Sequence, residues 1–168
     1  ESKGITTNII ESKNIMLMLQ EKYDKFHAVI SHSLGTLNAF YALKNGVESS
    51  SIVSIAGVSD FGYLPRNFLN QLRLGDKTEY YLRKHLEDKF NFIDNIWSAF
   101  SAHLHPEKIQ SRVYIIHDKD DDWVDLEQSM MLNQSYGKGN NLYLTDFLGH
   151  YRILTDQEVI NRIINYIN

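Results

Sequence analysis

Residues 29–37 read VISHSLGTL, and this stretch decides the fold that the sequence predicts. Just before its centre, residues 26–31 form a short run that is nearly all apolar and rich in β-branched side chains, which is typical of a buried parallel strand. Residues 34–44 carry a helical pattern that ends at Asn45-Gly46. A serine between a strand and a helix, with small residues two positions to either side, is typical of a nucleophile elbow.

In such an elbow the hydroxyl of Ser33 is held clear of the sheet, and the backbone N–H of Leu34 points to where an oxyanion would form. Ser31 and Gly35 meet the expected need for small neighbours, with serine in place of the usual glycine. The same residues also fit an ordinary strand-to-helix turn in which serine caps the helix, because small residues are common there. Consecutive side chains in the turn point in different directions, so we expect His32 to pack beside the sheet.

The rest of the chain alternates between helical and strand patterns. Helices are predicted over residues 8–22, 126–136 and 155–167, with Asn8 and Thr155 as N-caps, and strands over residues 51–56, 112–117 and 141–145. This alternation indicates an α/β fold with a parallel sheet and helical crossovers. Residues 60–105 are different, because they are aromatic and helical in pattern and have a proline near each end. They predict an added helical segment.

Four aspartates follow the strand at residues 112–117, in the sequence DKDDDWV of residues 118–124. The carboxyl end of a parallel strand is where active sites of α/β proteins form, so one of them is a candidate acid. Mutual repulsion indicates that most of the others are solvated loop residues. A calcium-binding EF-hand loop is rejected, because its required glycine and glutamate positions hold Trp123 and Ser129.

Gly149-His150 follows the last predicted strand, and Gly149 gives the backbone freedom to swing an imidazole over the elbow. Taken alone, His150 is as well explained by a structural histidine, since the chain has seven histidines. However, His150 follows Ser33 and an aspartate in the chain, and this order favours a catalytic role over a structural one. Serine needs a base to act as a nucleophile, and the histidine needs a carboxylate to fix its tautomer.

Three segments, SHSLG, IHDKDD before WV, and LGHYRIL, resemble the α/β-hydrolase superfamily, in particular small serine hydrolases of the esterase type. The resemblance covers residues 26–168. It implies that Ser33 is the nucleophile, Asp121 the acid and His150 the base, with the Leu34 N–H in the oxyanion hole. Asp120 is the alternative acid. The resemblance implies no cofactor and no metal.

The resemblance also divides the chain into two parts. Residues 1–59 and 106–168 would form a partial α/β-hydrolase core, and residues 60–105 a helical cap or lid inserted into it. The family normally has about four further strands before the elbow, and a loop among them gives the second oxyanion donor. Only 32 residues precede Ser33 here. We therefore expect a fragment, or upstream strands supplied from elsewhere, with the elbow strand at a sheet edge.

Composition excludes several classes of function. The chain has no cysteine, a net charge of −4 and a pI of about 6.0, which argues against disulfides, thiolate metal sites and nucleic-acid binding. No apolar run reaches the ~18 residues of a membrane span. His103 and His105 lack acidic partners and predict a plain loop. We expect a cytoplasmic protein that acts on a small-molecule acyl substrate; the sequence indicates no oligomeric state.

Two hypotheses of function remain. The first is a serine hydrolase that cleaves a carboxylic ester, thioester or related acyl bond through an acyl-enzyme on Ser33. The alternative is a hydrolase-like module that binds a small molecule without chemistry. The triad residues favour the first hypothesis, and the missing second oxyanion donor favours the second.

Overall fold

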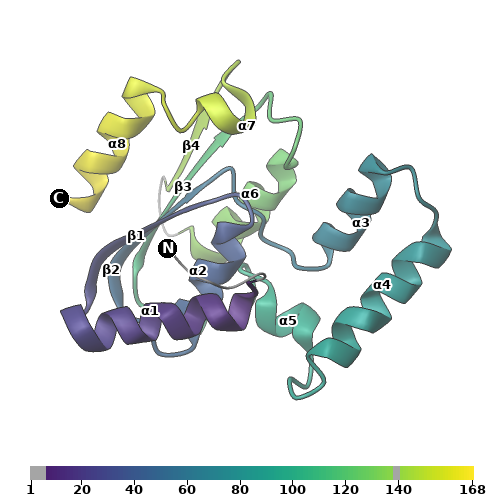
Figure 1. Ribbon diagram of the computed structural model, residues 1–168. Helices are drawn as coiled ribbons and strands as arrows, with labels where there is room; N and C mark the ends of the chain where they lie inside the picture. Colours follow the sequence, from purple (N-terminus) through teal and green to yellow (C-terminus); the bar gives the residue numbers. More distant parts are fainter. Residues whose placement is uncertain (1–6, 138–140) are drawn as a thin grey trace.

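The computed structural model describes residues 7–137 and 141–168 (Figure 1). Its centre is a sheet of four strands in the order β1-β2-β3-β4, and every neighbouring pair is parallel. The strands are β1 (Phe26–His32), β2 (Ser49–Ile55), β3 (Arg112–Asp118) and β4 (Leu142–Thr145). The predicted α/β class with a parallel sheet is confirmed.

Eight α-helices and one 3₁₀ turn connect and cover the strands of the described chain. They are α1 (Ile9–Tyr23), α2 (Gly35–Lys44), α3 (Tyr63–Gln71), α4 (Asp76–Lys89), α5 (Ile96–Phe100), η1 (Pro106–Lys108), α6 (Leu126–Tyr136), α7 (Gly149–Arg152) and α8 (Gln157–Ile167). Asn8 is the N-cap of α1, as predicted, because its side chain accepts from the N–H groups of Ile10 and Glu11. The predicted cap Thr155 is wrong: Asp156 caps α8 by accepting from the N–H of Val159.

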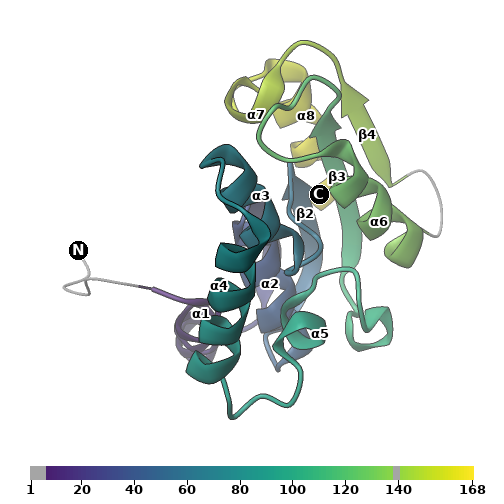
Figure 2. The same cartoon turned by 90° about the vertical axis from the view of Figure 1, so that its right-hand side faces the viewer.

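The two faces of the sheet are covered by different helices (Figures 1 and 2). Because side chains alternate along a strand, Ile52, Val113 and Ile115 pack with the helices on one face. Val53 and Ile116 point the other way, into a smaller core that α8 closes. The strands follow one another in sequence order, so the crossovers through α2 and α6 lie on the same face.

Strand β1 lies at an edge of the sheet, as expected from the short segment before Ser33. Ile30 on this strand is 54% exposed, although its neighbour in the register, Val53 on β2, is fully buried. The carboxyl ends of the strands position the candidate functional residues. The carboxyl ends of β1, β3 and β4 carry the segments with Ser33, Asp121 and His150, and parallel strands bring these segments to one edge.

Residues 60–105 contain α3, α4 and α5, and α5 packs against α2. The rings of Phe61 and Phe90 each pack edge to face on the ring of Phe100, with 5.0 and 5.2 Å between ring centroids. Helix α4 has no buried residue and, with α3, stands away from the sheet (Figure 1). Among residues 7–137 and 141–168, no helix is long and apolar enough to cross a membrane.

Candidate active site

Ser33 forms a strained turn between β1 and α2. Its φ is +55°, a left-handed conformation that costs energy in any residue with a side chain. Three backbone hydrogen bonds hold it there: its N–H donates to the carbonyl of Ile55, and its carbonyl accepts from the N–H groups of Thr36 and Val58, all at 3.1 to 3.2 Å. Ser33 is half-buried.

The positions near this turn that require a small side chain are not the ones that the sequence predicts. A Cβ atom at Gly35 would meet nothing within 4 Å, so the predicted need for a small residue there is wrong in this chain. The close approach is instead at Gly57, where a Cβ would collide with the hydroxyls of Ser54 and Thr36. Ser31 is buried, and its hydroxyl donates to the carbonyl of Val53 at 3.1 Å, which explains why serine is tolerated at this position.

Asp121 and His150 form a buried pair. The Nδ1 atom of His150 lies 2.7 Å from Oδ2 of Asp121, and the two side chains are only 4% and 1% exposed. The other carboxylate oxygen accepts from the N–H groups of Trp123 and Val124, at 2.8 and 2.9 Å. Because the carboxylate can only accept, Nδ1 carries the proton, and Nε2 of a neutral imidazole is left as the acceptor.

His117 lies next to this pair without competing for it. Its Nε2–H donates to the carbonyl of Val124 at 3.0 Å, and its Nδ1 accepts from the hydroxyl of Ser129 at 2.7 Å. Burial lowers the pKa of His117, so it stays neutral. Asp121 therefore has one close imidazole partner, His150, and His117 stands 3.7 Å away.

Asp118 organises the loop that carries His150. Its fully buried carboxylate accepts from the N–H groups of Leu148 and Gly149, from the N–H of Asp120, and from the hydroxyl of Thr145, at 2.6 to 3.0 Å. Burial raises the pKa of this carboxyl, but the four hydrogen bonds outweigh burial and hold the pKa below its ordinary value. No sequence signal separated Asp118 from its neighbours.

Replacing Asp118 by asparagine is expected to lower the free energy of unfolding by about 3 kcal/mol at pH 7, because an amide N–H₂ would face two of the four donors. The lowered pKa means that the ionised form stabilises the fold above the unfolded value of about 4, and that this contribution is lost as pH falls through the folded pKa. Urea unfolding at several pH values measures this. A difference between wild type and variant that stays constant down to about pH 2 would contradict it.

Asp120 and Gly149 also shape this loop. Asp120 Oδ2 accepts from the N–H of Phe147 at 2.7 Å, and no hydrogen bond joins Asp120 to His150, although both lie in the described chain. Gly149 has φ +65°, as its predicted backbone freedom requires. The predicted loop around His150 is in fact the one-turn helix α7.

His32 does not pack beside the sheet, so that prediction is wrong. Its ring lies against the ring of His150, with 4.5 Å between centroids and a 44° tilt. Its Nε2 lies 2.9 Å from the backbone carbonyl of His150, so Nε2 carries the proton and donates it. Burial lowers the pKa of His32. His32, the residue before Ser33, thus contacts and hydrogen-bonds to His150, the candidate base.

The structure therefore brings Asp121 and His150 into contact and connects His150 to the Ser33 turn through His32. No hydrogen bond joins the Ser33 hydroxyl to His150, both of which lie in the described chain. His103 hydrogen-bonds to the carbonyl of Ser59 and His105 to the hydroxyl of Ser98. His105 Nδ1 also lies 3.6 Å from a carboxylate oxygen of Glu107, so the expectation that it lacks an acidic partner is wrong. Over residues 7–137 and 141–168, no group of three or more His, Asp or Glu side chains could hold a metal ion.

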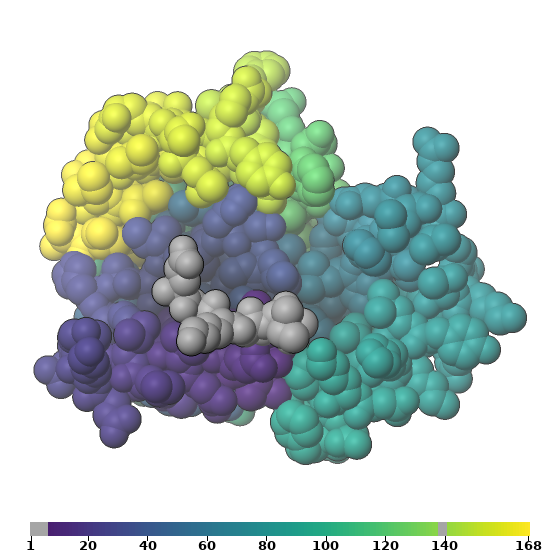
Figure 3. Space-filling view, viewed as in Figure 1, coloured from purple at the N-terminus to yellow at the C-terminus, as the bar shows by residue number. Residues whose placement is uncertain are grey.

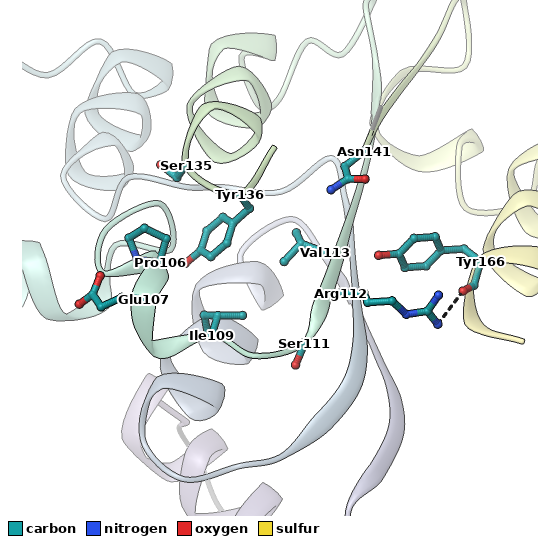
Figure 4. A pocket seen from close by; sticks show the side chains of 10 residues that line it. All are labelled: Pro106, Glu107, Ile109, Ser111, Arg112, Val113, Ser135, Tyr136, Asn141 and Tyr166. Carbon is teal, nitrogen blue, oxygen red and sulfur yellow. Dashed lines mark hydrogen bonds between the residues drawn. The ribbon is translucent and has the colours of Figure 1, made fainter. Parts of the chain in front are cut away.

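Two hollows lie at different distances from the carboxyl edge of the sheet, where Ser33, Asp121 and His150 are found. One of about 590 Å³ lies at the amino end of β3, the opposite end from Asp121 (Figure 4). There Arg112 donates to the carbonyl of Tyr166 at 3.1 Å. The other, of about 290 Å³, is mostly apolar and lies next to Leu34, the residue after Ser33, with Leu64 and Phe90 in its wall.

The fold is similar to those of many solved proteins. A meta-cleavage product hydrolase from Pseudomonas fluorescens IP01 matches with a TM-score of 0.61 at 14% identity, over 99% of this chain and 74% of that protein. An esterase from Pyrococcus furiosus matches at 0.62 and 17% identity, over 95% and 60%. A lipase-esterase related protein from Clostridium acetobutylicum matches at 0.62 and 17% identity, over 100% and 79%.

No protein-family model matches the chain, and no curated protein matches its sequence. The chain spans 60% to 79% of the length of the three solved proteins above. At identities this low, the likeness establishes a shared fold, and any activity has to be argued from the residues of the site.

Proposed function

Because the chain has the α/β-hydrolase fold, we propose that the protein is a serine hydrolase that cleaves a carboxylic ester, thioester or related acyl bond through an acyl-enzyme on Ser33. The observation that carries this proposal is the buried pair of His150 and Asp121, joined at 2.7 Å, at the sheet edge that also holds the strained Ser33 turn. A strained serine and an oriented imidazole at one edge are the parts that acyl transfer needs.

In the proposed reaction, Nε2 of His150 accepts the Ser33 proton while the serine oxygen attacks the acyl carbon. Asp121 keeps Nδ1 protonated and stabilises the imidazolium that forms. The N–H of Leu34, at the start of α2, donates to the developing oxyanion. His150 then gives its proton to the departing alcohol or thiol, and water releases the acyl group by the reverse sequence. These steps need no cofactor.

Residues 60–105 are proposed to act as a cap over this edge. The apolar hollow of about 290 Å³ lies between Leu34 and the cap residues Leu64, Leu86 and Phe90. A ligand cavity usually measures ~300–1,000 Å³, so this hollow is just below the small end of that range. It supports a short, apolar acyl group next to the proposed nucleophile.

A second candidate function is a binding module with the same fold and no chemistry. It is favoured by the lack of a hydrogen bond between Ser33 and His150, two described residues. Labelling with a fluorophosphonate discriminates between the two, because only an activated serine reacts with this probe.

The experiment treats the protein with a fluorophosphonate and maps the modified peptide by mass spectrometry. The proposal expects stoichiometric labelling on Ser33. The control is Ser31→Ala, which removes the other serine of the turn; it should lower the free energy of unfolding by about 1 kcal/mol and retain labelling. A folded protein that is not labelled, or is labelled elsewhere, would favour the binding module.

His32 provides a prediction on positioning within the proposed site. His32→Phe keeps a ring against His150 but loses the hydrogen bond to its carbonyl, so we expect kcat/KM for a short ester to fall about tenfold. His32→Gln places an amide donor near the position of Nε2 and should stay within about threefold of wild type. Equal rates for the two variants would show that the hydrogen bond does not position the imidazole.

A further inference from the structure

Aromatic rings surround the imidazole of His150. The Tyr151 ring meets it edge to face, with 5.0 Å between centroids. The Trp123 ring lies 6.3 Å from it and is tilted by 31°. Trp123 and Tyr151 also contact each other, at 5.8 Å and 70°. The group that would carry the proton in the reaction is therefore packed against an aromatic cluster.

Trp123 and Tyr151 are far more exposed than the imidazole that they contact. Trp123 is 47% exposed and Tyr151 is 59% exposed, whereas His150 is 5% exposed. Large aromatic side chains left open to solvent beside a buried titratable pair indicate a surface that binds something apolar. We call Trp123 and Tyr151 the aromatic platform.

The aromatic platform is attached directly to the acid and the base. The N–H of Trp123 donates to Asp121, and the carbonyl of Trp123 accepts from the side chain of Asn67 in α3 at 3.1 Å. Tyr151 is the next residue after His150 in α7. In Figure 3 the green segment that follows β3 lies between the yellow-green segment and the teal segment of α3, with a notch next to α3.

The direction of proton transfer decides which part of a substrate meets the platform. In acyl transfer the protonated histidine delivers its proton to the departing group, so side chains around His150 contact the alcohol half of an ester. The apolar hollow beside Leu34 has neither Trp123 nor Tyr151 in its wall, so it is separate from the platform and is left for the acyl half.

We propose that the aromatic platform binds the alcohol half of the substrate, and that this alcohol is neutral, flat and aromatic, of the benzyl type. This inference rests on the proposed function. In the step concerned, the Ser33 oxygen forms a bond to the acyl carbon, the bond between that carbon and the alcohol oxygen breaks, and His150 gives its proton to that oxygen. The aromatic alcohol leaves, and water then frees the acid.

The packing of the rings favours a flat neutral group over a quaternary ammonium group. A cage for such a cation needs rings spaced around it, whereas Trp123 and Tyr151 pack edge to face, with 5.8 Å between centroids and 70° between planes, and leave no room for a cation between them. An anionic alcohol is disfavoured by Asp120 and Asp122, which carry negative charge on the same loop as Trp123. A neutral ring is left as the group that stacks best.

Binding can be measured without catalysis. The chain has two tryptophans, so Trp97→Phe makes Trp123 the only one, and its fluorescence then reports on the platform. Benzyl alcohol is expected to change this emission in a saturable way, and cyclohexylmethanol and choline to bind more weakly. No saturable change with benzyl alcohol, or tighter binding of choline, would overturn the proposal. The result stands apart from whether Ser33 is a nucleophile.

Kinetics test the same proposal through the ratio of kcat/KM for benzyl acetate over ethyl acetate. Trp123→Leu, apolar but not flat, is expected to lower this ratio about tenfold, mainly through KM, and Trp123→Phe to retain most of it. The control is Tyr23→Ala, which removes an exposed ring (65%) from α1, outside the proposed cap, and should leave the ratio unchanged. If the ratio is unchanged in Trp123→Leu, the proposal is overturned. Absence of turnover in wild type would count against the proposed function alone.

Discussion

Replacing Ser33 by alanine is expected to reduce kcat for a short aryl ester by a factor of about 10⁴ or more, because the attacking oxygen is gone and only binding and oxyanion stabilisation remain. Alanine should occupy the turn as serine does, since both have a Cβ atom and meet the same cost at φ +55°. The fold, checked by circular dichroism and thermal unfolding, should therefore be retained.

The control for this variant is Ser59→Ala. The Ser59 hydroxyl is buried and has no hydrogen-bond partner among the described residues, so its removal should affect neither folding nor turnover. Turnover by Ser33→Ala within about tenfold of wild type would contradict the assignment of Ser33 as nucleophile.

Replacing Asp121 by asparagine is expected to lower kcat about 10⁴-fold, with little change in the fold. The asparagine carbonyl can still accept from the N–H groups of Trp123 and Val124, as Oδ1 of Asp121 does. Its amide N–H₂ would then face Nδ1 of His150 and force the imidazole proton onto Nε2. In that tautomer His150 cannot accept a proton from Ser33.

Asp120→Asn is the matched control, one residue away on the same loop. Asp120 accepts from the N–H of Phe147 and makes no hydrogen bond to His150, so its loss should change kcat by less than about tenfold. Steady-state kinetics on both variants decide between the two aspartates. A larger loss from Asp120→Asn than from Asp121→Asn would make Asp120 the acid.

Hydrophobic period and turn residues were sufficient to predict most of the fold. The strands were predicted from short β-branched runs, and α6 was predicted over the range that the structure shows, residues 126–136. The predicted cap Thr155 was wrong because the neighbouring Asp156 also fits a cap, and only the backbone conformation decides between them. The one-turn helix α7 is too short to give a periodic signal.

The site was only partly predictable, because its supporting contacts join residues far apart in the chain. The order of serine, aspartate and histidine indicated Ser33 and His150, and the pair with Asp121 is now placed at 2.7 Å. The contact of His32 with His150 spans 118 positions, and that of Asp118 with Gly149 spans 31. Such pairings depend on how the strands align at one edge, which sequence periodicity does not specify.

The crystal structure of the fluorophosphonate adduct would test the central claim most directly. We expect phosphorus bonded to Ser33 Oγ, Nε2 of His150 within about 3.2 Å of an oxygen of the adduct, and the N–H of Leu34 donating to the phosphoryl oxygen. A phosphorus atom on another residue, or a His150 imidazole turned away and still more than about 5 Å from the adduct, would contradict it.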